Sequence, residues 1–367
     1  PGDINSLDDF KNFPVISKDM VRENQADIVS DEIDSLNVSI GKTGGTTGPP
    51  LKVYKDNHTR EYTWAAYYRW YDWIDIDLGE PILALWGSPT VLKISQKEKI
   101  KSSFVDFLQN IKHINSFNLT NEQIDKIIKE LSNGKYTFLK GYLSAILDIT
   151  NRIKERGLNS TISLKAISST TETLLPHYRK LIEDVLQAPV YNQYGCGECG
   201  SIAFECNKQE GLHITSEHVL LENITGIKDG KTSDELIITD LDNYAMPFIK
   251  YKNGDMGVFT LDKCSCGNNL PILKEVSGRT ADTIKLKNGS NAHGVFFTDI
   301  FYEIGYNLTN QIERFQAVQH RDNTVDFYIQ SKKSLSDETK ERLHKAIHQF
   351  VDLKKIEIVN HIPNEDS

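Results

Sequence analysis

Residues 121–186 alternate between helix-like and strand-like stretches, and this alternation constrains the fold more than any other feature of the chain. Apolar residues at helical spacing mark 121–131, 143–154 and 175–186, and short strand-like stretches mark 136–139 and 164–167. Strands that alternate with helices of this length form parallel sheets covered by helices. The sequence therefore predicts a mixed α/β fold with mostly parallel sheets.

Two later regions predict other kinds of structure. Short strand-like stretches at close spacing between residues 212 and 260 predict an antiparallel, barrel-like subdomain. An apparent hairpin over 311–330, a helix over 338–351 and a strand over 356–359 predict a small α+β unit. Because 367 residues are enough for two domains, we expect a large N-terminal domain over 1–277 and a small C-terminal domain over 278–367.

An aromatic helix is expected over residues 61–73. Trp64, Tyr67, Tyr68 and Tyr71 recur there at the i, i+3, i+4, i+7 spacing of one helical face. We predict that this face packs in the core rather than serving as a platform for a ligand.

Composition and charge exclude several classes of partner. A net charge of −9 argues against nucleic acid, because phosphate binding depends on a high density of lysine and arginine. No apolar run approaches the roughly 20 residues that span a bilayer, and the first residues do not resemble a signal peptide. The five cysteines are clustered, which is typical of thiols or metal ligands rather than a disulfide framework. We therefore expect a cytoplasmic protein with neither a nucleic-acid nor a membrane partner.

Residues 43–48 form a loop rich in glycine and threonine: Thr43, Gly44, Gly45, Thr46, Thr47 and Gly48. Such a loop offers backbone N–H groups and short hydroxyls without side-chain bulk, and Lys52 adds a cation nearby, so it can cradle a triphosphate. A flexible surface loop is the alternative. The loop stands between the apolar stretch 36–40 and the strand-like stretch 51–54, and this ordered position favours the nucleotide interpretation.

Two familiar nucleotide motifs fit the chain poorly. Gly41-Lys42-Thr43 supplies the end of a P-loop motif, but Leu36 stands where its first glycine is needed and no helix follows directly. The run 195–200 matches G-x-G-x-x-G, yet the residues after it alternate like a strand, whereas the dinucleotide motif must open a helix. The informative part is Tyr194 to Glu198, where Tyr194 beside Gly195 can stack on adenine and Glu198 can bind Mg²⁺. Taken alone, a turn with a solvated glutamate is the simpler interpretation.

Four motifs in one order resemble those of the adenylate-forming ligases, which join a carboxylate to AMP before they pass the acyl group on. T-G-G-T-T-G followed by P-x-K resembles their phosphate loop, and Ser169-Thr170-Thr171-Glu172 falls where the family contacts adenine. Tyr251-Lys252-Asn253-Gly254-Asp255 is similar to their Y-R-T-G-D motif, and Ser277-Gly278-Arg279 begins a stretch similar to their G-R-x-D-D hinge. The resemblance covers nearly the whole chain and is strongest to the phenylacetate–coenzyme A ligase-like branch, which includes proteins of capsular polysaccharide clusters.

The resemblance implies a role for each motif. Thr43, Thr46, Thr47 and Lys52, with Gly44, Gly45 and Gly48, would bind the β- and γ-phosphates, and Glu198 would hold Mg²⁺. Thr170, Thr171, Glu172, Tyr194 and Gly195 would flank adenine, while Asp255 and Arg279 would hold the ribose. The implied cofactors are ATP, Mg²⁺ and coenzyme A, the implied partners are a small-molecule carboxylate and an acyl acceptor, and the C-terminal domain would be a lid. A homodimer stays open as an alternative to a monomer.

Three departures from the family pattern leave other functions open. Gly197 stands where many members have Thr or Ser, and Ala281 replaces the first hinge aspartate. The sequence ends at Ser367, where the family continues into a Gly-Lys whose lysine neutralises charge on the transferring phosphate. One alternative is an acyl or aminoacyl ligase that delivers its acyl group to a sugar amine in polysaccharide biosynthesis. Another is a nucleotide-binding relative without ligase activity.

Cys264 and Cys266, followed by a glycine, resemble half of a zinc knuckle and need two further ligands. Cys196 and Cys199 would complete a Cys₄ site, but they overlap the candidate nucleotide turn. Cys206 and His213 would complete a Cys₃His site, and we prefer this set because the related branch carries cysteine and histidine at those places. Thiols that lie near one another by chance are the third possibility. The metal, Zn²⁺, would be structural.

Overall fold

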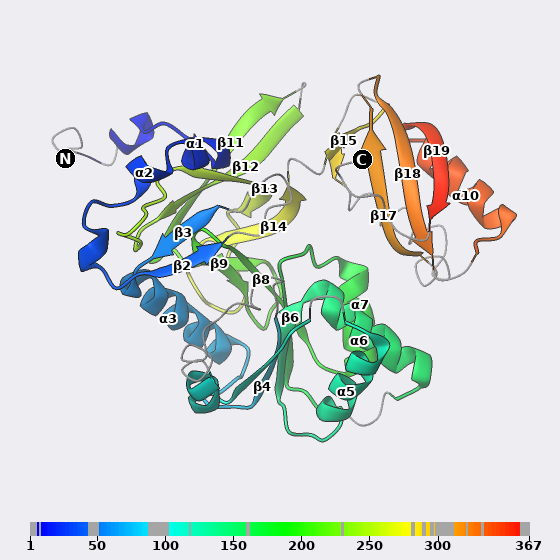
Figure 1. The fold of residues 1–367 in the computed structure, drawn as a ribbon, viewed down its shortest axis with the longest axis horizontal. Coiled ribbons are helices and arrows are strands. Elements are labelled where there is room, and N and C mark those ends of the chain that lie inside the picture. The colour runs from blue at the N-terminus through cyan, green and yellow to red at the C-terminus, as the bar shows by residue number, and fades with distance from the viewer. Residues whose placement is uncertain are drawn as a thin grey trace. The chain divides into compact units, whose positions relative to one another are not determined.

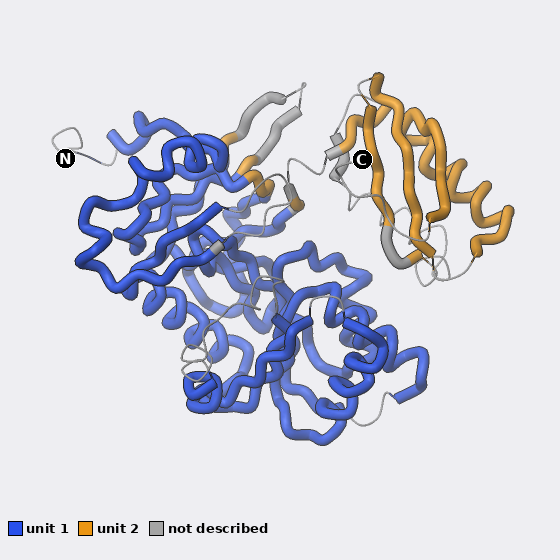
Figure 2. Tube along the Cα trace, in the orientation of Figure 1, with its two compact units in different colours: residues 1–223, 236–253, 257–276 blue, residues 224–235, 254–256, 277–367 orange. Residues whose placement is uncertain are grey.

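The computed structural model describes residues 6, 9–42, 51–86, 103–116, 119–158, 162–228, 231–279, 283–287, 291–293, 297, 312–320, 322–331 and 334–359. The chain divides into two compact units (Figure 2). The first comprises residues 1–223, 236–253 and 257–276, and the second comprises 224–235, 254–256 and 277–367. The domain boundary that we place between residues 277 and 278 stays a prediction.

Five parallel strands form one part of the first unit. They are β4 (Ile82–Leu85), β5 (Ile111–Ile114), β6 (Phe138–Tyr142), β7 (Ala166–Thr170) and β8 (Val190–Cys196). They lie in the order β5-β4-β6-β7-β8, and each neighbouring pair is parallel. The predicted α/β alternation is confirmed.

Helices cover both faces of these strands. One face carries α5 (Asn121–Leu131), α6 (Leu143–Arg156) and α7 (Pro176–Leu186), which lie together beside β4 and β6 (Figure 1). Their buried isoleucines and leucines pack against Leu83, Leu139 and Ile167 of the strands. The other face carries α3 (Asn57–Trp73), whose Trp70 and Tyr71 pack against the strands. Burial of the two helix layers against the sheet is the main source of stability for this unit.

The aromatic face of α3 is buried only in part. Tyr71 is 3% exposed, whereas Trp64 and Tyr68 are each 37% exposed. The residue buried most completely is Trp70, which the predicted face does not include. The prediction that all four aromatic residues pack in the core is therefore wrong for Trp64 and Tyr68, because the contact with the strands is centred on Trp70 and Tyr71.

Antiparallel strands continue the sheet beyond β8. They are β9 (Gly200–Glu205), β10 (Leu212–Ile214), β11 (Val219–Lys228), β12 (Lys231–Asp240), β13 (Tyr251–Thr260) and β14 (Ile272–Arg279). The order is β11-β12-β13-β14-β10-β9-β8, and β1 (Ile16–Ser17) pairs with β13. The predicted antiparallel region is present, but the described strands form an open sheet and no closed barrel, because the ladder joins the parallel strands at β8 rather than closing on itself.

The chain before β4 contributes short elements. They are the 3-10 turns Asp9–Asn12 and Ile33–Ser35, α1 (Lys18–Glu23), α2 (Gln25–Ile28), β2 (Ser39–Lys42) and β3 (Lys52–Lys55). Helix α1 begins after Ser17, whose hydroxyl accepts a hydrogen bond from the Met20 N–H, as N-cap residues do. No helix among the described residues is long and apolar enough to cross a bilayer.

The second unit holds a small α+β arrangement. Strands β17 (Ile312–Gln319) and β18 (Thr324–Ser331) are antiparallel, and β18 pairs in parallel with β19 (Asp352–Val359). Helix α10 (Asp337–His348) buries Leu343 and Ile347 in the same hydrophobic cluster as strand residues of β18. A two-stranded sheet of β15 (Thr283–Lys285) and β16 (Asn291–His293) precedes them. The predicted ββαβ order is confirmed.

Candidate active site and metal centre

The candidate phosphate loop joins the two strands of a hairpin. β2 and β3 pair antiparallel, and Lys42 lies opposite Lys52 where the described strands end. Thr43, Gly44, Gly45, Thr46, Thr47 and Gly48 lie outside the described residues. Lys52 is exposed, and its ammonium lies 4.7 Å from the centre of the Tyr54 ring. The loop is therefore flanked by two paired strands, in the setting that the sequence predicts.

The turn at residues 196–200 links β8 to β9 within an antiparallel hairpin. No helix follows the G-x-G-x-x-G run, so the structure agrees that this run is not a dinucleotide motif. Gly195 lies against the carbonyl of Gly200, and a Cβ at this position would collide with that oxygen. Tyr194 is 8% exposed, and its hydroxyl accepts a hydrogen bond from the Asn253 amide at 3.0 Å.

Glu198 is a buried carboxylate with two partners on one oxygen. The Tyr251 hydroxyl donates to Glu198 Oε1 at 2.9 Å, and Lys18 Nζ lies 3.3 Å from the same atom. Burial raises the pKa of Tyr251 above its usual range, and the neighbouring Glu198 raises it further, so the phenol stays protonated. The interpretation of Glu198 as a solvated turn residue is thus excluded, because its side chain is 6% exposed.

The candidate adenine contacts lie at the carboxyl end of β7. Thr170 is the last residue of β7 and is buried, and Thr171 has φ +78°, an uncommon conformation for a β-branched residue. Glu172 accepts hydrogen bonds from the Ser144 N–H at 3.1 Å and the Ser144 hydroxyl at 2.7 Å. β7 pairs in parallel with β8 as far as Ser169 and Asn192, so this turn and Tyr194 lie just beyond the paired residues of the two strands. Ligands of open α/β sheets bind at this edge of the strands.

Asp255 and Arg279, the candidate ribose ligands, lie on β13 and β14. Asp255 is 7% exposed and belongs to the second unit. Arg279 is the last residue of β14, and its side chain lies outside the described residues. Their joint use with Tyr194 stays a proposal.

Four candidate metal ligands come together at one end of β9 and β10. The ligand atoms of Cys206, His213, Cys264 and Cys266 all lie within 4.8 Å of one another. Cys206 Sγ lies 3.6 Å from Cys264 Sγ, and Cys266 Sγ lies 3.4 Å from His213 Nε2. Two sulfurs bound tetrahedrally to one zinc at about 2.3 Å lie about 3.8 Å apart, whereas a disulfide needs about 2.05 Å. The spacing suits a shared metal.

Backbone groups and charge around this cluster also suit a metal. The N–H groups of Lys208 and Asn268 each donate to a sulfur at 3.4 Å, to Cys206 and Cys266 respectively. Burial lowers the pKa of His213, so its ring is neutral, which is the form that binds a metal. Within the described residues, Cys196 and Cys199 belong to no group of three or more such ligands.

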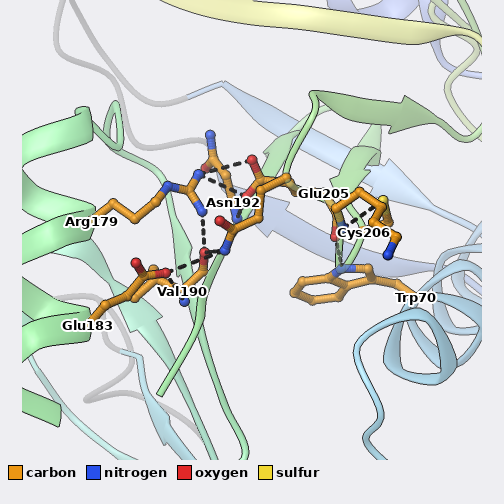
Figure 3. Close-up of polar contacts among 9 residues, drawn as sticks. Trp70, Arg179, Glu183, Val190, Asn192, Glu205 and Cys206 are labelled. Atoms are coloured by element: carbon orange, nitrogen blue, oxygen red, sulfur yellow. Dashed lines mark hydrogen bonds and ion pairs between the residues drawn. The ribbon is translucent and has the colours of Figure 1, made fainter. Parts of the chain in front are cut away.

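A buried ion pair supports the segment that leads to Cys206. Arg179 on α7 donates two hydrogen bonds at 2.9 Å to the Glu205 carboxylate, and the Asn192 N–H donates a third at 2.8 Å (Figure 3). The Trp70 indole donates to the Glu205 carbonyl at 2.8 Å. Burial raises the pKa of Glu205 even though Arg179 opposes this shift. These hydrogen bonds therefore link α3, α7 and β8 to the last residue of β9, immediately before Cys206.

The structure also contains a buried group that the sequence did not reveal. His218 Nδ1 lies 2.5 Å from Asp242, and His218 Nε2 lies 3.0 Å from the Cys199 carbonyl. Asp240 lies in the same cluster and accepts the N–H groups of Asp242 and Asn243. These contacts tie the turn at Glu198 to the loop after β12. The only sequence signal was Asp240-x-Asp242 after an apolar strand.

Known proteins resemble this chain over part of its sequence. No family model matches the chain. A curated relative, phenylacetate–coenzyme A ligase from Thermus thermophilus, is 26% identical over 187 residues, which are 48% of this chain and 41% of that protein. The matched region therefore spans less than half of the relative. The resemblance to the phenylacetate–coenzyme A ligase-like branch is confirmed in this region.

Solved structures cover more of the chain at lower identity. 2-Hydroxyisobutyryl-CoA ligase, solved with an acyl-adenylate, has a TM-score of 0.75 and 18% identity over 100% of this chain and 80% of its own. O-succinylbenzoate coenzyme A synthetase from Bacillus subtilis, solved with AMP, has a TM-score of 0.59 and 13% identity over 89% and 66%. Anthranilate-CoA ligase, solved with anthranoyl-AMP, has a TM-score of 0.61 and 12% identity over 89% and 64%. The chain thus has the fold of the adenylate-forming coenzyme A ligases.

Proposed function

We propose that this protein activates a carboxylic acid with ATP and transfers the acyl group to coenzyme A. The observation that carries the proposal is the buried Glu198 on the β8–β9 turn, in contact with Tyr251 and Lys18, in a chain with the fold of these ligases. The curated relative and the solved ligases act on different acids, so they support the reaction type and leave the acid open.

In the proposed reaction, an oxygen of the substrate carboxylate attacks the α-phosphorus of ATP. The bond between the α- and β-phosphates breaks, and pyrophosphate leaves with its electron pair. The thiolate of coenzyme A then attacks the acyl carbon, and AMP leaves. The protein acts mainly by holding the reactants in line and by neutralising charge.

We assign the residues as follows. Thr43, Thr46, Thr47 and Lys52 and the glycines Gly44, Gly45 and Gly48 bind the β- and γ-phosphates. Thr170, Thr171, Glu172, Tyr194 and Gly195 surround adenine, and Asp255 with Arg279 holds the ribose. Glu198 holds Mg²⁺, which would neutralise charge on the phosphates. The second unit serves as the lid.

The test is isotope exchange between pyrophosphate and ATP, measured over a panel of aryl, fatty and amino acids. We expect exchange that depends on one class of acid, because adenylation is reversible before the acyl group is transferred. Addition of coenzyme A should then yield a thioester. An acid that supports exchange but gives product only with a sugar amine would assign the protein to polysaccharide modification. ATP binding without exchange for any acid would contradict the ligase activity.

We also propose that Cys206, His213, Cys264 and Cys266 bind one structural zinc ion. The distances above and the choice of three sulfurs and one imidazole support this proposal. The site fills all four tetrahedral positions with protein ligands and thus has no open position for catalysis. It would pin the turn at Cys264 and Cys266 to β9 and β10.

Protein purified without chelator should therefore carry about one zinc ion per chain, as measured by elemental analysis. The double variant Cys206→Ser, His213→Ala should lose the metal, because two ligands do not hold it. The matched control is Cys196→Ser, Cys199→Ser, which should retain it. Absence of metal from the unmodified protein, or its loss only in the control, would contradict this assignment.

A further inference from the structure

A row of polar side chains lies under α3, near the middle of the parallel strands. The register places Lys140 of β6 beside Ser168 of β7 and beside Ala84 of β4, whose other neighbour is His113 of β5. Paired residues of neighbouring strands share one face of a sheet. This face is the one that α3 covers, because Phe138, two residues before Lys140, packs against Trp70 and Tyr71.

Lys140 is half-buried, and it has aromatic neighbours where such a lysine normally has a carboxylate. Its ammonium donates a hydrogen bond to the Tyr71 hydroxyl at 3.2 Å and lies 4.1 Å from the centre of the Tyr67 ring. No carboxylate contacts it within the described part of the chain. Burial without an anionic partner lowers the pKa of Lys140 to about 7. An anion at this place would therefore gain a charged hydrogen bond and relieve the cost of burying the ammonium.

Two neighbouring polar atoms also lack a partner. Among the described residues, the fully buried Ser168 hydroxyl has no hydrogen-bond partner, and neither does the amide oxygen of Gln193 on β8, which is 6% exposed. The other end of the Gln193 amide contacts the Tyr67 hydroxyl. An amide flip would offer its nitrogen instead of its oxygen to a ligand. Buried polar atoms are almost always paired, so unpaired ones beside a lysine without a counter-ion indicate a ligand.

We propose that Lys140 and Ser168 bind a second anionic group of the acid, so that the substrate is a dicarboxylate or a similarly charged acid. The inference rests on the proposed function and names its substrate class. The row lies two residues before Thr170, the last residue of β7, and the reacting carboxylate would lie at that end of the strand. An acid with an apolar far end would leave the ammonium without a counter-ion and the buried Ser168 hydroxyl without a hydrogen bond, which costs affinity.

The test compares each dicarboxylate, from malonate to suberate and including the benzene dicarboxylates, with its own monomethyl ester. The ester keeps the reacting carboxylate and the shape but loses the second charge. In pyrophosphate exchange, kcat/KM for the preferred dicarboxylate should exceed that for its ester by at least about tenfold. Lys140→Met should remove this preference, while Lys140→Arg should keep part of it.

The matched control is Lys112→Met, which removes a lysine from β5, two strands away from β6, where it pairs with Glu130. It should leave the preference unchanged. Equal use of acid and ester by the unmodified protein would overturn the inference while the proposed function stands. If no acid supports exchange, the proposed function fails. In that case, calorimetry of the dicarboxylates without ATP tests the inference. Binding that is lost in Lys140→Met supports it, and no binding by the unmodified protein overturns it.

Discussion

Arg179→Met is expected to lower the free energy of unfolding by about 3 kcal/mol or more, because it leaves the Glu205 carboxylate buried without its partner. Glu205 is 5% exposed, and Arg179 supplies two of its three hydrogen bonds (Figure 3). Urea unfolding at pH 7 measures the loss. The double variant Arg179→Met, Glu205→Gln should recover much of the stability, because it no longer buries a charge.

The loss should depend on pH in a definite direction. Burial raises the pKa of Glu205 in the folded state, and removal of Arg179 raises it further. A carboxyl group with a raised folded pKa opposes folding above its unfolded pKa, and this effect disappears as the pH falls and the group is protonated in both states. The difference between variant and unmodified protein should therefore shrink from pH 7 towards pH 4. A difference that grows as the pH falls would contradict this account.

A surface pair provides the control for this prediction. Arg152 also donates two hydrogen bonds to a carboxylate, that of Asp125, but this carboxylate is 29% exposed, against 6% for Glu205, and Arg156 contacts it as well. Water and salt replace such a pair at little cost. Arg152→Met should therefore be far less destabilising than Arg179→Met. Equal losses of unfolding free energy in the two variants would show that the burial of Glu205 does not increase the cost of removing its partner.

The helices could be predicted well because their signals are local. Residues 121–131 begin after Thr120, which forms a capping box with Gln123, and their isoleucines fall on one face. Two strands, β6 and β7, were predicted two residues too early, at 136 and 164 rather than 138 and 166, and β19 was predicted four residues too late, at 356 rather than 352. A strand begins where the neighbouring strands supply partners for its backbone, and residues 138 and 166 pair with each other. Sequence alone does not contain this information.

The candidate site could also be predicted only where its sequence signal is local. Cys264 and Cys266 were recognisable because their spacing is local, whereas the choice between two further pairs depended on the fold. The β9–β10 hairpin brings Cys206 and His213 together, and the loop before β14 brings them to the other two cysteines. Lys140 had no signal, because a single lysine in a strand resembles any surface lysine. Only the structure shows that α3 covers Lys140 and that Tyr67 and Tyr71 of this helix contact its ammonium.

Glu198→Gln should lower the rate of pyrophosphate exchange on the order of 100- to 1000-fold, the usual loss when one group that stabilises developing charge is removed. The amide keeps the shape and can still accept the hydrogen bond of Tyr251, so the fold should survive. The concentration of Mg²⁺ that gives half-maximal binding of ATP, measured by calorimetry, should rise as well. This second measurement separates a metal ligand from a residue that only supports the turn.

Lys18→Met is the decisive control, because Lys18 lies 3.3 Å from Glu198 and is the partner that a purely structural ion pair would require. If Glu198 serves only that pair, the two variants should lose the same activity and the Mg²⁺ dependence should not change. If Glu198 holds the metal, Lys18→Met keeps the carboxylate and should retain most of the exchange activity. Removal of the competing ammonium should also leave the carboxylate more available to Mg²⁺, so the half-maximal concentration should fall in Lys18→Met and rise in Glu198→Gln. Opposite shifts of the half-maximal Mg²⁺ concentration in the two variants would indicate metal binding, because loss of a shared contact would have the same effect in both.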